Sequence, residues 1–190
     1  MTHALAGYRV VGRDARADWQ DAGLPEGDLV SMSGCVTTVV PSTEWDEWFG
    51  DRESAAVARA GRDGLHVLAV GIDSRDVAAV LEDVADGGWD VAAGSLPERL
   101  ARTEPLPDGD VLGFELVGFD SGTWHTWTCL GGLVGDVGRA TGIRPGRWGL
   151  VHDAHDARVA AEWLTASGSG DPKVFLWVAV KVVDCAGVGA

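Results

Sequence analysis

The chain has 190 residues, 46% of them hydrophobic and 23% charged, which is the balance of an ordinary globular domain. Its 29 acidic and 15 basic residues give a formal net charge of −14, a field that repels nucleic acids and anionic membranes and attracts basic partners. No apolar stretch is long enough to span a bilayer, no signal peptide is evident, and the three cysteines lie far apart without CxxC spacing. We therefore expect a single cytoplasmic domain over residues 1–190 that needs no cofactor.

Strands and helices are both predicted in the first half of the chain. The expected strands, marked by β-branched or continuously apolar runs, lie within 7–14, 28–42 and 65–72. An alanine-rich run predicts a helix over 53–62. A second helix is expected to begin at a cap supplied by Asp73 or Ser74 and to end near 86–90, because its apolar residues recur at helical spacing.

The second half closes with a strongly apolar strand. Strands are predicted over 111–122 and 173–184. A short helix is expected inside the proline-rich connection 94–110, and a longer helix from about Asp153 to Ala166. Because residues 173–184 are apolar on both faces, this strand should lie centrally in a sheet. The elements intermix without strict βαβ alternation, which predicts an α+β fold: a mixed or mainly antiparallel sheet with three to four helices packed on it.

The sequence GTWHTWTCLGG at 122–132 concentrates two tryptophans, a histidine and a cysteine. If a helix begins at its first residues, Trp124 and Trp127 share one face, and His125 and Cys129 share another. A histidine and a cysteine in this relation can form a thiolate–imidazolium pair or supply two metal ligands. They are therefore the candidate catalytic residues.

Two neighbouring features bear on that candidate. Asp120 precedes the motif and is a possible third member of a catalytic group. Glycines at 131, 132, 135 and 138 fall in the expected helix body, where each costs about 1 kcal/mol relative to alanine. Such a helix needs close packing against other elements, so we favour a structural role, with Trp124 and Trp127 mostly buried.

A second cluster is VHDAHDA at 151–157. Two histidines and two aspartates within five positions, His152, Asp153, His155 and Asp156, are candidate ligands for a divalent metal. The segment also opens a predicted helix, where an aspartate N-cap and an acidic first turn are common for structural reasons. We favour the N-cap interpretation.

A third cluster combines acidic and aromatic residues in STEWDEWFGDRE at 42–53. Aromatic anchors surrounded by acids are typical of a surface that binds a basic protein. The candidate partner-binding residues are Glu44, Trp45, Asp46, Glu47, Trp48 and Asp51. The alternative is the start of an amphipathic helix, with the aromatic rings in the core and the acids at the helix N-terminus.

The segments DVLGFELVGFDSGTWHTWTCLGG and GRATGIRPGRWGLVHDAHDARVAAEW resemble a group of uncharacterised bacterial proteins that share an LGFE–W–C segment. The resemblance covers about residues 110–165 and does not reach the N-terminal half. Small acidic proteins of this type are similar to immunity proteins that neutralise polymorphic toxins. The resemblance implies tight binding of a toxin domain, often a basic nuclease, and no catalytic residues.

The leading functional hypothesis is therefore a protein-binding module, an immunity or antitoxin-type inhibitor of a basic partner. One alternative is a small hydrolase or a thiol- or metal-dependent enzyme that uses His125 and Cys129 or the 152–156 cluster. Another is a structural or assembly subunit. The oligomeric state stays open at this point.

Overall fold

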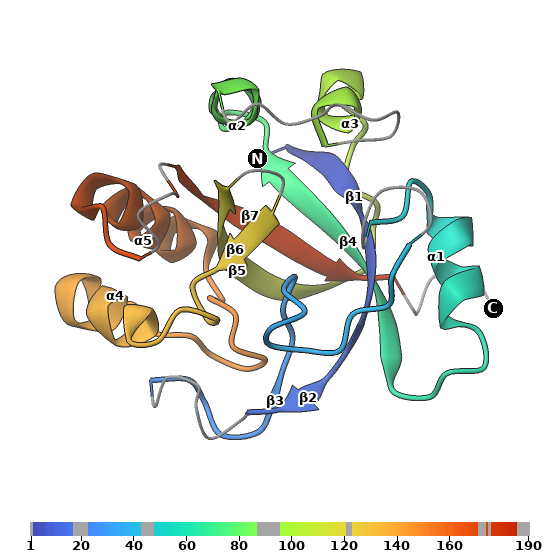
Figure 1. Cartoon of the computed structure of the whole chain (residues 1–190), viewed down its shortest axis with the longest axis horizontal. Helices are drawn as coiled ribbons and strands as arrows, with labels where there is room; N and C mark the ends of the chain where they lie inside the picture. Colours follow the sequence, from blue (N-terminus) through green and yellow to red (C-terminus); the bar gives the residue numbers. More distant parts are fainter. Residues whose placement is uncertain are drawn as a thin grey trace.

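The computed structural model describes residues 2–16, 23–42, 48–86, 96–120, 123–170, 174 and 176–185. The strands are β1 (His3–Gly12), β2 (Asp14–Ala15), β3 (Asp28–Leu29), β4 (Leu65–Asp73), β5 (Asp110–Asp120), β6 (Thr123–Thr126) and β7 (Trp177–Asp184). The helices are α1 (Arg52–Arg59), α2 (Val77–Asp86), α3 (Leu96–Arg102), α4 (Leu133–Thr141) and α5 (Ala154–Ser167). Five strands form an antiparallel sheet in the order β1-β4-β7-β5-β6, and β2 pairs with β3 in a small separate ribbon (Figure 1).

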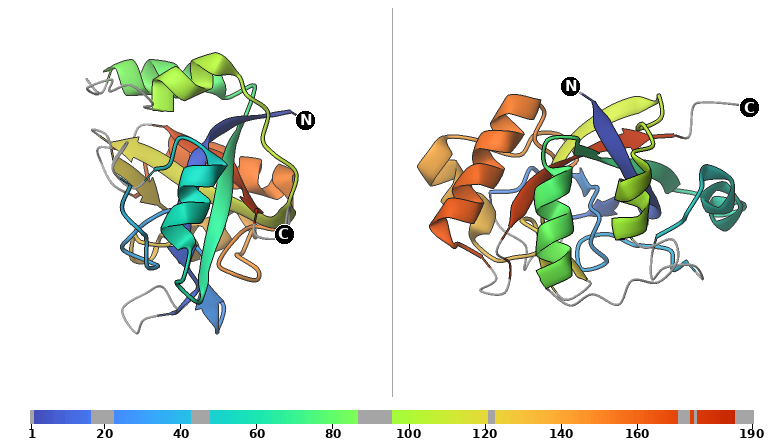
Figure 2. Two further views of the ribbon diagram at one scale, coloured as in Figure 1. Left: turned by 90° about the vertical axis from the view of Figure 1, so that its right-hand side faces the viewer. Right: turned by 90° about the horizontal axis from the view of Figure 1, so that it is seen from above.

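The sheet is apolar on both faces, and helices cover each of them. On one face, side chains of α2 and α3 pack with Val178, Val180 and Val182 of β7 in a shared cluster. On the other face, α4 and α5 pack over Trp177 toward one end, and α1 packs near Val183 toward the other end. The arrangement is visible from above, where α2 and α3 lie across the sheet and the other helices lie toward its two sides (Figure 2). The central position predicted for the closing strand is confirmed.

The sheet is curled, so that its two edges approach each other. Phe49 pairs with Tyr8 of the edge strand β1, which places the preceding Trp48 beside that edge. The Trp48 ring lies 4.5 Å from the ring of Trp124 on the opposite edge strand β6. Trp124 also meets Phe119 of β5 edge-on at 4.8 Å, so an aromatic cluster fills the inside of the curl.

The predicted helix across GTWHTWTCLGG is wrong. Residues 123–126 form the strand β6, which pairs with β5 in the register Val117↔Thr126 to Asp120↔Thr123. A turn follows, and α4 begins only after Gly132, whose φ of 84° is a left-handed conformation that favours glycine. The side chains nevertheless have the predicted burial, because Trp124 is 6% exposed and Trp127 is fully buried. Gly131 lies outside the helix with open space around it, so no close backbone approach occurs there.

The extended segment predicted within 28–42 is strand only at β3. A turn follows because the Ser33 carbonyl accepts hydrogen bonds from the backbone amides of Val36 and Thr37, at 3.0 and 3.2 Å. Beyond the turn the chain runs beside β1, where two backbone hydrogen bonds join residues 38–40 to Val10 and Gly12. The β-branched residues therefore cover the edge of the sheet instead of forming a long strand of their own.

The α+β class and the mainly antiparallel sheet are confirmed. Five helices are found in the described residues, one more than the three to four predicted. The additional helix is α3, whose buried side chains are part of the core on the sheet. None of the described helices combines the length and the apolar character that crossing a bilayer requires.

A pair of glycines gives a test of this packing. At Gly113 φ is +147°, and an added Cβ would lie 2.8 Å from the Val151 carbonyl oxygen. Gly113→Ala should therefore lower the free energy of unfolding by about 2 kcal/mol or more. Gly131→Ala adds a methyl group in open space and should leave stability unchanged or raise it by about 0.5 kcal/mol. Urea unfolding of both variants measures the difference, and equal midpoints would contradict the described packing.

Candidate functional site

A surface groove runs along helix α1. It has a volume of about 460 Å³ and is lined by Pro41, Ser42, Phe49, Glu53, Ser54, Val57 and Ala58. We call it the α1 groove. Val57 is 71% exposed and lies one helical turn after Glu53, so the two side chains share the outer face of the helix. The groove thus combines an apolar wall with an acidic rim.

The local sequence explains why α1 stands where it does. Asp51 is the N-cap, and its carboxylate accepts hydrogen bonds from the Ser54 backbone amide at 2.8 Å and from the Ser54 hydroxyl at 2.9 Å. These hydrogen bonds hold the pKa of Asp51 below its usual value. Arg52 donates to the Cys185 carbonyl at 2.7 Å, and Ala55 is buried against the sheet. The helix is therefore fixed on its inner side and open on its outer side.

The acidic–aromatic cluster is only partly described. Glu44, Trp45, Asp46 and Glu47 lie outside the described residues. Trp48 is 2% exposed, and its ring packs against Trp124 and the guanidinium group of Arg9, so its predicted role as a surface anchor is wrong. Asp51 is exposed, but its carboxylate is engaged as the helix cap. The alternative of a helix start with an aromatic ring in the core is correct for these two residues.

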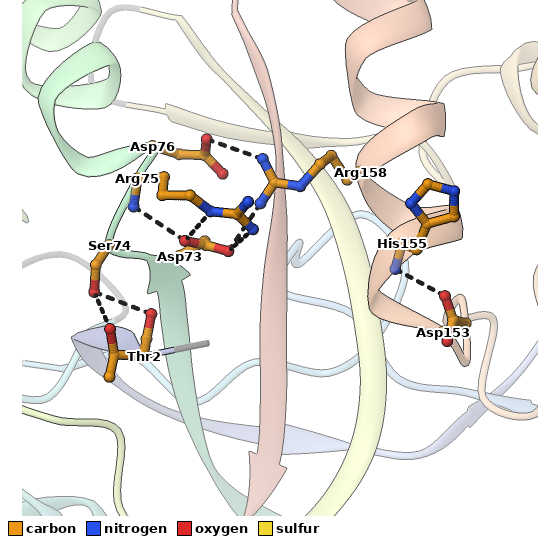
Figure 3. Close-up of polar contacts among 8 residues, drawn as sticks. All are labelled: Thr2, Asp73, Ser74, Arg75, Asp76, Asp153, His155 and Arg158. Atoms are coloured by element: carbon orange, nitrogen blue, oxygen red, sulfur yellow. Dashed lines mark hydrogen bonds and ion pairs between the residues drawn. The ribbon is translucent and has the colours of Figure 1, made fainter.

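A polar cluster joins the end of β4 to α2 and α5 (Figure 3). Asp73 accepts three hydrogen bonds from Arg75, from the backbone amide at 3.0 Å, Nε at 3.1 Å and Nη2 at 2.7 Å, and another from Arg158 of α5 at 2.8 Å. Arg158 also lies 3.7 Å from the carboxylate of Asp76. The Arg75 hydrogen bond is the main cause that holds the pKa of Asp73 far below its usual value, whereas burial raises the pKa of Asp76.

An apolar pocket of about 270 Å³ lies beside this cluster, between α2 and α5 and above the start of β7. Its floor is formed by Leu176, Trp177, Val178 and Ala179, and Glu162 stands on its rim. Because Arg158 already contacts two carboxylates, it fastens α5 to the end of β4 and does not present a free cation to this pocket.

A carboxylate is fully buried inside the curl of the sheet. Glu115 of β5 accepts hydrogen bonds from Ser31 and Thr126, both at 2.6 Å, and from the Met32 backbone amide at 2.8 Å. Burial raises the pKa of Glu115, and these hydrogen bonds and the charge of Arg9 oppose that rise. Because its oxygens are satisfied from within the protein, the group holds the loop at 31–33 and β6 in place.

The helix expected to carry the predicted thiol site does not form. His125 lies in the extended strand β6, so the helical spacing that would place it beside Cys129 does not exist. Cys129 is half-buried in the turn and donates its thiol to the Thr126 carbonyl at 3.1 Å. Burial raises the pKa of this thiol, which is the opposite of what an activated nucleophile needs. Asp120 pairs with Thr123 at the end of the β5–β6 pairing.

One of the candidate metal ligands has a structural role. Asp153 is the N-cap of α5, and its Oδ1 accepts from the His155 amide at 2.8 Å and the Asp156 amide at 3.1 Å. The first of these hydrogen bonds is drawn in Figure 3. Among the described residues, which include His152, no group of three or more His, Cys, Asp and Glu side chains is placed to hold a metal ion. The N-cap interpretation of Asp153 is confirmed.

Comparison of the chain with models of protein families, with curated proteins and with solved structures finds no match. The segment that carries the resemblance to immunity proteins forms β5, β6, α4 and α5. That resemblance stays a prediction.

Several residues of the sites described above were not predicted from the sequence. Arg158 reaches Asp73 across 85 positions, a distance in sequence at which pattern gives no signal. Val57 was treated only as part of an alanine-rich helix. It is the one large apolar residue of that helix, between Ala56 and Ala58, and this isolation is a usable signal of an exposed apolar side chain. Glu115 was not singled out either, although a single acid within an apolar strand is a usable signal of an acid that faces the core.

The Asp73 cluster predicts an acid-dependent stability. Because the folded pKa of Asp73 is depressed, its stabilising contribution is complete above the ordinary aspartate value of about 3.9 and is lost as the pH falls below it. Asp73→Asn should lower the free energy of unfolding by about 3 kcal/mol at neutral pH and by progressively less in acid. Asp136→Asn, which removes an exposed pair with Arg139, should cost about 0.5 kcal/mol or less.

Urea unfolding as a function of pH measures this contribution. A constant difference between wild type and Asp73→Asn down to strongly acidic pH would contradict the assignment, as would an equal loss in the Asp136→Asn control.

The thiols predict an order of chemical modification. Cys35 is exposed, Cys129 half-buried and Cys185 buried, and burial raises the pKa of the last two. Iodoacetamide at neutral pH should therefore modify Cys35 first and Cys129 slowly, and should reach Cys185 only after unfolding. Peptide mass spectrometry gives the three rates. A Cys129 that reacts faster than Cys35 would instead restore the thiol-enzyme hypothesis.

Proposed function

We propose that this protein acts by binding a basic partner protein, and that the α1 groove receives an apolar side chain of that partner. The observation that carries the proposal is the 71% exposure of Val57 at a groove of about 460 Å³. An apolar side chain held in water beside a concave surface is typical of a protein-binding site.

The charge of the segment that leads into α1 supports a basic partner. Residues 44–53 contain five acids and one basic residue, Arg52. The guanidinium group of Arg52 is bound to the Cys185 carbonyl, whereas Glu53 is exposed on the groove rim. Together with the net charge of −14, these acids speed the encounter with a positively charged surface.

The rest of the described molecule fits a binding role better than a catalytic one. Cys129 has a raised pKa and no catalytic histidine on a shared helix face, and Asp153 serves as a helix cap. In the more specific form suggested by the resemblance of residues 110–165, the protein is an immunity or antitoxin-type inhibitor and the partner is a basic toxin domain.

Matched substitutions at exposed positions test the proposal. Immobilised protein is incubated with an extract of the cells that produce it, and retained proteins are identified by mass spectrometry across a salt series. We expect retention of a basic protein that salt elutes. Val57→Asp should weaken its binding about thirtyfold, as for an interface anchor worth about 2 kcal/mol. Glu53→Gln should weaken it less and reduce the salt dependence.

The controls change the same chemistry elsewhere. Val111→Asp alters another exposed apolar side chain, which is 54% exposed, and Glu82→Gln removes an exposed acid from α2. Both should bind as wild type does. A retained protein that is acidic, or that is lost equally from Val57→Asp and Val111→Asp, would refute the proposal, and so would the retention of no protein at low salt.

A further inference from the structure

A third cavity lies on the sheet face that α1 and α5 share, and unlike the apolar pocket beside α5 it is lined by a lysine. It has a volume of about 250 Å³ and is lined by Thr2 and His3, the segment 105–109, Val111, Lys181 and Val183. We call it the Lys181 pocket. Lys181 lies on the central strand β7 between Ala179, which packs toward α5, and Val183, which packs toward α1. The pocket therefore opens over the middle of the sheet.

Both walls of the Lys181 pocket are fixed by hydrogen bonds. On one side, Ser74 holds Thr2 through its backbone amide at 3.1 Å and its hydroxyl at 3.0 Å, both donated to the Thr2 carbonyl; the hydroxyl contact appears in Figure 3. On the other side, the Leu106 amide donates to the His3 carbonyl at 3.0 Å, and the Leu5 amide donates to the Glu104 carbonyl at 2.7 Å. The pocket is thus formed before any ligand arrives.

Two glycines allow these walls to approach the sheet. A Cβ at Gly71, which pairs with Lys181 across the sheet, would lie 2.8 Å from the Leu106 side chain and 3.1 Å from the His3 Cβ. A Cβ at Gly109 would lie 2.6 Å from the Asp184 carbonyl oxygen. Larger residues at either position would push the 105–109 segment away, so the pocket depends on both glycines.

The charge in the pocket is unusual for this protein. Five arginines in the described part of the chain pair with carboxylates, in Arg13–Asp184, Arg75–Asp73, Arg158–Asp73, Arg102–Glu98 and Arg139–Asp136, and others donate to backbone carbonyls, as Arg52 does. Lys181 is half-buried, yet no hydrogen bond or ion pair joins its ammonium group to another described residue. A partly desolvated cation without a counter-ion, in a chain of net charge −14, leaves room for an anionic ligand.

His3 adds a second donor to the same space. Its imidazole is half-buried and packs near Phe114, with the ring centroids 6.2 Å apart. Burial lowers the pKa of His3, and the charge of Lys181 lowers it further, while Asp73 opposes both effects. A neutral imidazole still carries one N–H group that can donate to an anion.

From this geometry we propose that the Lys181 pocket binds a small metabolite that bears a carboxylate or a phosphate monoester, with Lys181 and His3 as donors to its oxyanion. The exposed Asp108 at the pocket wall disfavours ligands of higher negative charge, such as polyphosphates. The volume of about 250 Å³ suits a small metabolite and is below the range usual for larger cofactors.

Inorganic phosphate and acetate are the probes for this site. Each is titrated into the full-length protein at constant ionic strength, and the His3 ring signals, assigned with His3→Gln, are followed by NMR. We expect a saturable shift with at least one of the two anions. The stronger of the two identifies the ligand as a phosphate ester or a carboxylate.

Substitutions separate the site from general charge effects. Lys181→Met keeps the aliphatic part of the side chain and should weaken binding about tenfold or more. Val111→Asp adds a negative charge at an exposed wall position, without a packing change, and should also weaken it. Val57→Asp, which adds the same charge on α1, should bind as wild type does.

Two results would overturn the proposal. One is the absence of a saturable shift with both anions. The other is binding that survives unchanged in a folded Lys181→Met variant, or in Val111→Asp if Lys181→Met does not fold. Circular dichroism of each variant establishes that it is folded, and Val111→Asp keeps the test decisive if Lys181→Met does not fold.

Discussion

The buried carboxylate of Glu115 is the constraint on which the inside of this fold depends. An ionisable group without solvent must have its oxygens satisfied by the protein, and here three donors do so from two different segments. Ser31 and Met32 come from a loop far away in sequence, and Thr126 comes from β6. The requirement of one side chain therefore fixes both the loop and the edge strand.

This fixation also shapes the aromatic cluster. With β6 held by Thr126, Trp124 faces into the curl and meets Trp48 from the other edge of the sheet. Trp48 in turn packs under Arg9, whose charge acts on Glu115. The Arg9 guanidinium, the Glu115 carboxyl group and two indole rings thus lie together where the two sheet edges approach. The surface sites consequently lie on the outer side of the sheet and around it, where α1 and the 105–109 segment leave space.

Much of the fold could be predicted from the local sequence, because the spacing of apolar residues along an element indicates which of its faces are buried. The two-faced apolar run at 173–184 predicted a central strand, and Asp153 predicted a helix N-cap, since both depend on neighbouring residues only. The helix predicted across GTWHTWTCLGG was wrong because it, too, was based on neighbouring residues only. Its aromatic residues fit a helical face as well as a strand, and the pairing of Val117 with Thr126 that decides between them is a contact between two strands.

The sites were harder to predict than the fold, and the reason is again sequence distance. The α1 groove could be approached from sequence because its exposed valine and its acid, Glu53, lie within one short segment. The Lys181 pocket could not, because it joins the N-terminus, the 105–109 connection and the last strand. A lysine in an apolar strand was visible in KVFLWVAVKVVD, but nothing local indicated that His3 lies beside it.

The two proposed sites use the same negative field in opposite ways. At the α1 groove the net charge of −14 adds to the local acids, so a basic partner is attracted from a distance and added salt weakens the attraction. At the Lys181 pocket the net field repels the ligand, so binding depends on short-range donors in a partly desolvated space. Salt that screens the field lowers this repulsion and also competes for Lys181. The distant charges of the protein therefore strengthen binding at the α1 groove and weaken it at the Lys181 pocket, and this opposite effect distinguishes the two sites.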